Sequence, residues 1–214
     1  SKDQTYFLYM LNQSIMKNLL FPLQDIDKNE VKNIAKDFDL SIYQKKESMG
    51  ICFIGKKDFS SFIKKYINTK HGNICDEDGY VLGEHDGLFN YTIGQRKGIR
   101  IGGNKNYSEK PWFVISKDIN ENKLIISQNQ DRLISSGKVG LKNMSWVRSQ
   151  PSINFKCKAR FRHGGKLIPV NITQDNDKYH LDMLDGERAI TPGQSAVLYD
   201  DDECIGGGII SYVC

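Results

Sequence analysis

Cys52 is the residue whose type and setting could most directly support covalent chemistry. It lies in the apolar segment Gly50-Ile51-Cys52-Phe53-Ile54-Gly55, a few residues after Lys45 and Lys46. A cysteine buried in an apolar strand is inert, because burial raises the pKa of its thiol. Flanking glycines that leave room for a substrate, with lysines that favour the thiolate, would instead make a nucleophile or a sulfur carrier. The residues alone leave both interpretations open.

A run of alternating basic residues could bind phosphate groups. If segment 156–162 is a strand, its basic side chains share one face, and these are Lys156, Lys158, Arg160 and Arg162. The opposite face then carries Cys157, Ala159 and Phe161. A solvated sheet face is the alternative, although no acidic residue balances the charge within the run. The segment Gln95-Arg96-Lys97-Gly98 has the same two interpretations, because glycines permit either close ligand approach or simple turns.

The sequence gives little support for a metal centre or a nucleotide loop. The four histidines, His71, His85, His163 and His180, lack metal-ligand spacing, so structural roles are expected for them. Gly206-Gly207-Gly208 lacks the Lys-Ser/Thr of a phosphate-binding loop, which favours a bend in a strand. The five cysteines form no Cys-x-x-Cys pair, which argues against a zinc ribbon or a disulfide scaffold and indicates a reducing compartment.

Length and composition predict a folded protein without a membrane span. The chain has 214 residues, 39% of them hydrophobic and 26% charged, and its mean hydropathy is -0.50. No stretch approaches the roughly 18 apolar residues of a membrane helix, and the first residues do not resemble a secretory leader. The net charge of +4 permits contact with nucleic acid but is below that of a strongly basic binder.

Helical periodicity dominates the first third of the chain. Residues 5–20 predict one amphipathic helix that Pro22 ends. Asp27 is the expected N-cap of a second helix, with Glu30 three residues later. Its predicted buried stripe consists of Val31, Ile34, Ala35 and Phe38. Residues 58–67 repeat the pattern and predict a third helix.

After residue 72, short β-prone runs separated by turn residues replace the helical period. Residues 73–83 and 111–127 predict two hairpins, and the basic, glycine-rich segment 91–103 between them predicts an ordered loop. The later strand candidates are regularly spaced, as expected for a small antiparallel barrel or sandwich, and they are 155–161, 167–172, 179–184 and 196–199. The predicted class is α+β, with a helical part at 1–65, a small central β-containing domain at 66–135 and a C-terminal antiparallel β-barrel at 136–214.

Five motifs together resemble those of the tRNA-specific 2-thiouridylases. They are Lys2-Asp3-Gln4-Thr5-Tyr6-Phe7-Leu8, Gly50-Ile51-Cys52-Phe53-Ile54-Gly55, Tyr91-Thr92-Ile93-Gly94-Gln95-Arg96-Lys97-Gly98, Thr191-Pro192-Gly193-Gln194-Ser195-Ala196-Val197 and Cys204-Ile205-Gly206-Gly207-Gly208. The motifs follow the order that they have in the family and extend from the first residues to the last few. The resemblance therefore covers essentially the whole chain.

The resemblance implies a reaction and a division of labour. Enzymes of this family replace the 2-oxygen of the wobble uridine with sulfur, using ATP to adenylate the uridine and a cysteine persulfide to supply the sulfur. The family's Ser-Gly-Gly-x-Asp-Ser ATP loop and first catalytic cysteine do not occur in this sequence. We therefore expect the C-terminal portion of such an enzyme, with the ATP site in an N-terminal domain outside this chain, no cofactor bound here and no thiolation by this chain alone.

The resemblance also assigns residues and partners. Cys52 corresponds to the persulfide-carrying cysteine, which releases its sulfur by forming a disulfide with the family's other catalytic cysteine. Lys2, Asp3 and Gln4 are implied to face tRNA near the target base, and Arg160, Phe161 and Gln194 to contact tRNA from the barrel. The implied partners of a monomer are tRNA and a persulfide sulfur-donor protein, in the cytoplasm or alternatively in an organelle. The rival interpretation is a non-catalytic tRNA-binding module in which Cys52 only packs.

Overall fold

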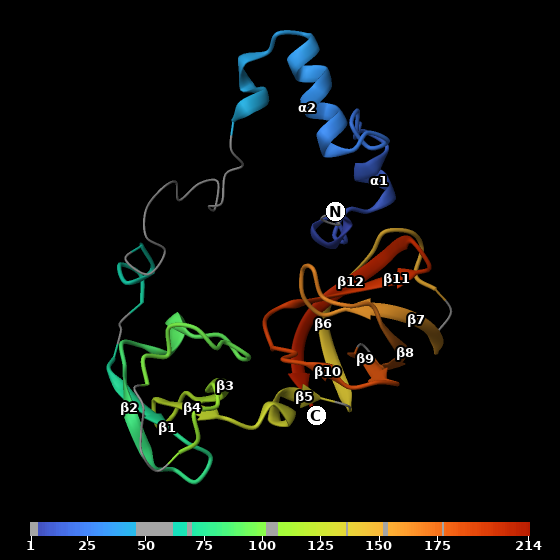
Figure 1. The fold of residues 1–214 in the computed structure, drawn as a ribbon. Coiled ribbons are helices and arrows are strands. Elements are labelled where there is room, and N and C mark those ends of the chain that lie inside the picture. The colour runs from blue at the N-terminus through green and yellow to red at the C-terminus, as the bar shows by residue number, and fades with distance from the viewer. Residues whose placement is uncertain are drawn as a thin grey trace. The chain divides into compact units, whose positions relative to one another are not determined.

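The computed structural model describes residues 4–45, 62–67, 70–101, 107–135, 137–151, 154–176 and 178–214. These residues belong to two compact units, one formed by 1–14 with 69–214 and the other by 15–68 (Figure 1). Short helices, a mixed sheet and a closed antiparallel barrel confirm the predicted α+β class. In the part of the chain that is described, no helix is both long and apolar enough to cross a membrane.

The C-terminal strands form a closed barrel in the order β11-β12-β6-β9-β8-β7. In chain order these strands are β6 (Lys138–Trp146), β7 (Phe155–Arg160), β8 (Ile168–Asp175), β9 (Lys178–Met183), β11 (Ser195–Asp200) and β12 (Glu203–Val213). Every neighbouring pair is antiparallel, and β7 pairs with β11 to close the ring. The regular strand spacing therefore produces a barrel rather than a sandwich. β12 shifts register at Gly207, in agreement with the bend expected there.

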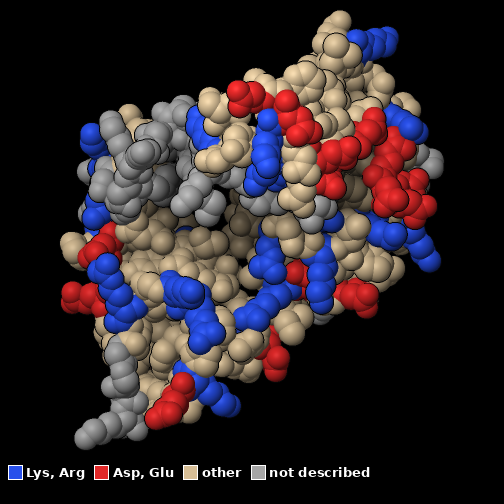
Figure 2. Space-filling view, turned by 45° about the horizontal axis from the view of Figure 1, so that its top comes forward, with Lys and Arg blue, Asp and Glu red and all other residues tan. Residues whose placement is uncertain are grey.

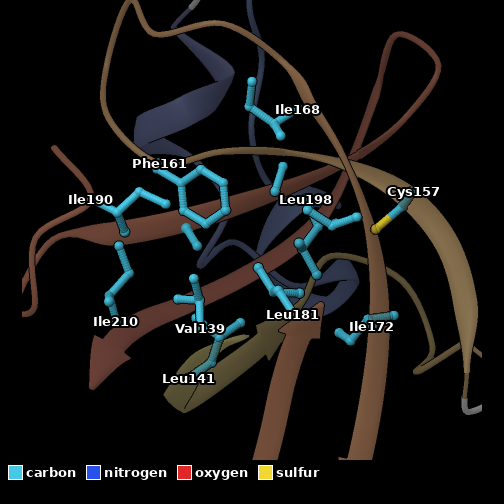
Figure 3. Packing of buried hydrophobic residues seen from close by; sticks show 13 residues of the cluster. Val139, Leu141, Cys157, Phe161, Ile168, Ile172, Leu181, Ile190, Leu198 and Ile210 are labelled. Carbon is cyan, nitrogen blue, oxygen red and sulfur yellow. The ribbon is translucent and has the colours of Figure 1, made fainter. Parts of the chain in front are cut away.

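Alternating side chains from these strands fill the barrel interior (Figure 3). The fully buried members include Ala159, Val170, Leu181, Leu198 and Ile210, which come from five different strands. Since successive residues of a strand point to opposite faces, each inward residue leaves its neighbours for the outer surface. This core fixes which side chains of β7 can reach a partner.

A four-stranded sheet forms the central part of the chain, in the order β2-β1-β4-β3. Two antiparallel hairpins build it, β1 (Gly72–Cys75) with β2 (Val81–His85) and β3 (Phe113–Asp118) with β4 (Lys123–Ser127), while β1 and β4 run parallel. Gly79 turns the first hairpin with a φ of 89°, a conformation that glycine adopts without strain. Both predicted hairpins are thus confirmed.

The central sheet and the barrel are joined by a short two-stranded ribbon. The helix η4 (Gln130–Leu133) precedes β5 (Ile134–Ser135), which pairs with β10 (Glu187–Arg188). The backbone N–H of Ala189 donates to the carbonyl of Leu133 at 2.7 Å, and the guanidinium of Arg188 lies 4.9 Å from the ring centre of Phe113. These contacts tie the barrel to η4 and β3.

The second unit contains the capped helix that the sequence predicts. Helix α2 spans Lys28–Asp37, and η2 spans Ser41–Gln44. The Asp27 carboxylate accepts hydrogen bonds from the backbone N–H groups of Asn29 and Glu30, which confirms the N-cap. The predicted burial is wrong, because no residue of α2 is buried and Phe38 is 75% exposed. Of the helix expected at 58–67, only 62–67 lies within the described residues, and Phe62 and Ile63 are helical there.

A single helix over residues 5–20 is also wrong. The structure has the 3-10 turn η1 (Thr5–Phe7), an irregular stretch and the four-residue helix α1 (Gln13–Met16). The side chains of Tyr6 and Tyr9 instead hydrogen-bond to Ser195 of the barrel. Tertiary contacts of this kind override a local preference worth less than about 1 kcal/mol per residue.

Candidate nucleic-acid interface

Strand β7 carries the predicted basic face. Lys156 and Lys158 are exposed and Arg160 is half-buried, whereas Cys157 and Ala159 point into the core. The alternation predicted for segment 156–162 is therefore confirmed. It arises because β7 lies in the barrel wall, with one face on the core and one in solvent.

Two of these cations have acidic partners that lie elsewhere in the sequence. Lys158 Nζ is 3.6 Å from an Asp201 carboxylate oxygen, and Arg162 Nη2 is 3.7 Å from a Glu187 carboxylate oxygen. Asp201 follows β11, and Glu187 begins β10. The run itself contains no acidic residue, so its sequence did not predict these two ion pairs. The Lys158–Asp201 pair is half- to fully exposed and contributes little to stability, so a phosphate can replace its carboxylate at small cost, whereas the Glu187 side chain is only 11% exposed.

Arg160 is held over an aromatic ring. Its guanidinium carbon lies 5.2 Å from the ring centre of Tyr199, a buried residue of β11. The Tyr199 hydroxyl is in turn 3.2 Å from the hydroxyl of Thr5. A cation–π contact of this type restricts the flexible arginine. Arg160 is thereby linked to the chain segment that contains Gln4.

The N-terminal segment docks on β11 through two tyrosines. The Tyr6 hydroxyl donates to the Ser195 carbonyl at 2.9 Å, and the Tyr9 and Ser195 hydroxyls are 3.0 Å apart. Burial, and to a lesser extent the nearby Tyr9, raises the pKa of Tyr6, so its hydroxyl remains a donor. Ser195 follows Gln194 in the chain, and the ring of Tyr199 contacts the Arg160 guanidinium. β11 therefore brings together the segments that contain Gln4, Arg160 and Gln194.

Gln194 is fixed through its backbone. Its carbonyl accepts from the N–H of Ile210 at 2.8 Å, and its own N–H donates to the Thr191 carbonyl at 3.2 Å. Its side-chain oxygen is buried and has no hydrogen-bond partner among the described residues. A buried acceptor without a hydrogen-bond partner is costly.

Phe161 lies in the barrel core and not on the surface. Its side chain is 3% exposed and packs with Ile190 and Leu198 in the same cluster (Figure 3). The structure therefore separates Phe161 from Arg160, which precedes it on the opposite face of the strand. Phe161 would affect a ligand bound to Arg160 indirectly, because it helps to fix the position of β7.

Three of the residues expected from the resemblance, Lys2, Asp3 and Cys52, lie outside the described residues. The four cysteines that are described, Cys75, Cys157, Cys204 and Cys214, are free thiols. Burial, together with the nearby Asp200 carboxylate, raises the pKa of Cys157 to about 12, which makes this thiol unreactive at neutral pH. Among the residues that the structure describes, no group of side chains has the arrangement of a metal site.

The basic loop at 91–101 is ordered by its own glutamine. Gln95 accepts from the Thr92 N–H through its side chain and donates to the Lys97 carbonyl, both at 2.9 Å. Backbone bonds between this loop and Val114 fasten it to β3. Arg96 and Lys97 remain exposed, so the loop presents charge while Gln95 is used internally.

The glycine-rich strand among the described residues does not fit the phosphates of ATP. The sequence contains no Ser-Gly-Gly-x-Asp-Ser loop, and the glycines of β12 line a packed strand instead. A Cβ at Gly206 would lie 2.5 Å from the Ser145 carbonyl oxygen, and one at Gly207 would lie 2.7 Å from the Ala196 carbonyl oxygen. These glycines are required by neighbouring strands, which leaves them unable to cradle phosphate.

Surface charge by itself does not select one face. Figure 2 shows Lys and Arg side chains interspersed with Asp and Glu side chains on the visible face. The basic groups are not confined to one patch there. The contacts around Arg160 are therefore more informative than the charge pattern.

The sequence did not predict the contact between Phe7 and His163. Phe7 is 59% exposed, and its ring centre lies 4.7 Å from that of His163. His163 was expected to be structural. The available signal was the run Tyr6-Phe7-Leu8-Tyr9, in which Phe7 and Leu8 are two of the apolar positions that predict a helix over residues 5–20.

Three family models match consecutive parts of the chain. The tRNA methyl transferase HUP domain matches residues 1–56, the tRNA methyl transferase PRC-barrel domain matches 60–128, and the aminomethyltransferase beta-barrel domain matches 136–210. The last of these contains Arg160 at the end of β7 and Gln194 just before β11. Every motif used for the resemblance falls largely or wholly within one of these matches.

Curated relatives align along nearly the whole chain. The tRNA-specific 2-thiouridylase MnmA of Francisella philomiragia is 46% identical over 213 residues, which cover 98% of this chain and 59% of the relative. The protein of the same name from Francisella tularensis subsp. tularensis is 44% identical over 214 residues, with the same coverage of both chains. The chain thus spans 59% of the length of these relatives. On the strength of the three matched domains and these identities, the chain belongs to the tRNA-specific 2-thiouridylase family as a partial member.

Proposed function

We propose that this chain is the tRNA-binding and sulfur-carrying part of a tRNA-uridine 2-sulfurtransferase. The whole enzyme would make 2-thiouridine at the wobble position with ATP and a cysteine persulfide. The observation that carries the tRNA-binding role is the placement of Arg160 on Tyr199, next to the docked N-terminal segment. Family membership supports the choice of tRNA as the nucleic acid.

In this proposal each residue has a distinct role. Arg160 binds backbone phosphate, and Gln194 donates or accepts hydrogen bonds beside it. Gln4, with Lys2 and Asp3, lies toward the target base, and Phe161 positions β7 from the core. Cys52 receives sulfur from a persulfide donor protein. Activation of the uridine by ATP belongs to residues outside this chain.

The three-part division at residues 65 and 135 is part of the same proposal. The matched models change near these positions, and β5, which pairs with β10, ends at the second of them. The proposed enzyme acts as a monomer on tRNA. In this arrangement the helical part carries Cys52, and the barrel carries Arg160 and Gln194.

Binding to tRNA tests the interface. We expect the chain to bind an unmodified tRNA transcript in a salt-dependent manner, since phosphate contacts release counterions. Arg160→Ala should weaken binding and reduce the slope of log affinity against log salt by about 1. Filter binding or fluorescence anisotropy at several salt concentrations measures both quantities.

Lys142→Ala is the matched control for this measurement. Lys142 is exposed on β6, which lies three strands from β7 in both directions around the closed barrel. Its removal takes away the same charge from the opposite wall and should leave the slope unchanged. Equal effects of the two substitutions, or binding that does not respond to salt, would contradict the proposed interface.

Cys52→Ser in the complete enzyme tests the sulfur-carrying role. A serine hydroxyl cannot hold a persulfide, so formation of 2-thiouridine should be lost while tRNA binding persists. Mass spectrometry of nucleosides from the treated tRNA detects the product. The control is Cys214→Ser, which removes an exposed thiol and should leave activity unchanged. Survival of activity in Cys52→Ser would favour the non-catalytic tRNA-binding module.

A further inference from the structure

Phe7 is a large aromatic side chain held in the open. It is 59% exposed, although the nearby Tyr6 and Tyr9 are buried. The backbone around it is fixed, because η1 closes with Leu8 N–H donating to the Thr5 carbonyl at 2.9 Å. The hydrogen bonds of the two tyrosines to Ser195 hold the same turn on the barrel. The ring is therefore presented to solvent by an anchored segment.

The ring of His163 packs against the ring of Phe7. The Phe7 and His163 ring centres are 4.7 Å apart with an interplanar angle of 35°, and Tyr6 meets Phe7 edge-on at 5.4 Å. His163 is also exposed, and it begins the turn after β7. The two side chains are far apart in the sequence and meet through the docking of η1 on the barrel.

The pair lies in a basic setting that joins Arg160. The Thr5 hydroxyl contacts the hydroxyl of Tyr199, the same ring that supports the Arg160 guanidinium. His163 follows Arg160 by three residues, with exposed Arg162 between them and exposed Lys166 in the turn that follows. Exposed aromatic rings combined with surrounding cations are the features by which proteins bind single-stranded nucleic acid.

We propose that Phe7 and His163 form a stacking platform for an unpaired base of the bound tRNA. This inference rests on the proposed function, and it adds to it the kind of nucleotide that the surface accepts. Arg160 holds the phosphate of that stretch of RNA, and the rings take the exposed face of a base beside it. Stacking requires an unstacked base, so the platform selects loops or bulges over continuous duplex.

Affinity measurements on ring variants test the platform. Phe7→Ala and His163→Ala should each weaken binding of an unmodified tRNA transcript roughly 5- to 100-fold, as expected from the loss of one stacked base. Their salt slopes should equal that of the unsubstituted chain, because no phosphate contact is removed. This separates them from Arg160→Ala, which changes the slope. Phe7→Leu should behave like Phe7→Ala, and Phe7→Tyr should retain binding.

Two controls complete the experiment. Tyr80→Ala removes another exposed aromatic ring, in the turn between β1 and β2, and should leave affinity unchanged. A continuous RNA duplex without unpaired residues is the second probe, and its weaker binding should be the same for Phe7→Ala and for the unsubstituted chain.

The outcomes distinguish this inference from the proposed function. If the unsubstituted chain does not bind the tRNA transcript, the proposed function is overturned. If it binds, and the two ring variants bind within twofold of it, only the platform is overturned. Loss of duplex binding by Phe7→Ala in the same proportion, or loss of tRNA binding by Phe7→Tyr, would show a structural role for Phe7 and would likewise overturn the platform.

Discussion

At the scale of single residues, the central sheet contains a coupled carboxylate and phenol. The Tyr107 hydroxyl donates to Asp76 at 2.5 Å, and the N–H groups of Asp78 and Tyr80 donate to the other Asp76 oxygen. Burial opposes ionisation of Asp76, but these hydrogen bonds outweigh it and lower the pKa of the carboxyl. The same hydrogen bond is the main reason that the pKa of Tyr107 is raised to about 12.

Tyr107→Phe should make stability less dependent on pH at both limits. The contribution of Asp76 is present above its unfolded pKa and is lost as pH falls through its lower folded value. The contribution of Tyr107 is present below pH 10, the ordinary pKa of tyrosine, and is lost as pH rises toward its folded value of about 12. Tyr107→Phe should therefore lower the free energy of unfolding mainly at pH values between the titrations of Asp76 and Tyr107. Urea unfolding at pH 3, 7 and 11.5 measures this difference.

The control for Tyr107→Phe is Tyr80→Phe, which removes an exposed hydroxyl close to the same turn. It should leave the pH profile unchanged. A constant stability difference between Tyr107→Phe and the unsubstituted chain across the pH range would exclude the coupling.

At the scale of elements, helix α2 depends on its cap more than on packing. Its residues are not buried, so the Asp27 hydrogen bonds to Asn29 and Glu30 form a large share of what holds its first turn. Asp27→Ala should cost about 1 kcal/mol of helix stability. Amide hydrogen exchange over residues 28–37 should become about fivefold faster.

Asp37→Ala is the matched control for the cap, because it makes the same chemical change at the opposite end of α2. A carboxylate near a helix C-terminus opposes the helix dipole, so exchange should stay equal or slow slightly. Faster exchange in this variant than in Asp27→Ala would argue against capping as the cause.

The same elements show which features the sequence could predict. The cap at Asp27 and the turn at Gly79 depend on residues a few positions apart, and both are confirmed. The helix predicted at 5–20 fails because Tyr6 bonds to Ser195, which is 189 residues away. Local patterns contain no information about such a partner.

The candidate site likewise has some features that the sequence predicts and others that it does not. The outward face of β7 follows from alternation within the strand, so the exposure of Lys156 and Lys158 could be predicted. The ion pair of Lys158 with Asp201 and the ring contact of Phe7 with His163 arise from barrel closure and from docking of η1. These contacts join distant segments and needed the structure.

At the scale of the whole molecule, the close approach of β12 to β6 makes one glycine critical. A Cβ at Gly206 would lie 2.5 Å from the Ser145 carbonyl oxygen and 2.8 Å from the Trp146 ring. Gly206→Ala should therefore lower the free energy of unfolding by about 1–3 kcal/mol, as for other overpacked sites. Urea unfolding of the chain measures the difference.

Gly164→Ala provides the comparison for this substitution. Nothing lies within 4 Å of its added Cβ, but its φ of 71° carries a backbone cost of about 1–2 kcal/mol. The two variants should also differ in their effect on Trp146, because only Gly206→Ala should change the environment of its ring. An unchanged Trp146 environment in Gly206→Ala would contradict the steric explanation.

The place of β12 in the ring also has a consequence for biosynthesis. Because β12 lies between β11 and β6, both of those strands have an unpaired edge until residues 203–213 have been made. At roughly 5–20 residues per second, β6 waits on the order of 3–15 s for this partner. Exposed strand edges invite pairing with other chains. During this interval the nascent barrel can either close or aggregate. A chaperone during synthesis, or slow dilution during refolding, determines which of the two occurs.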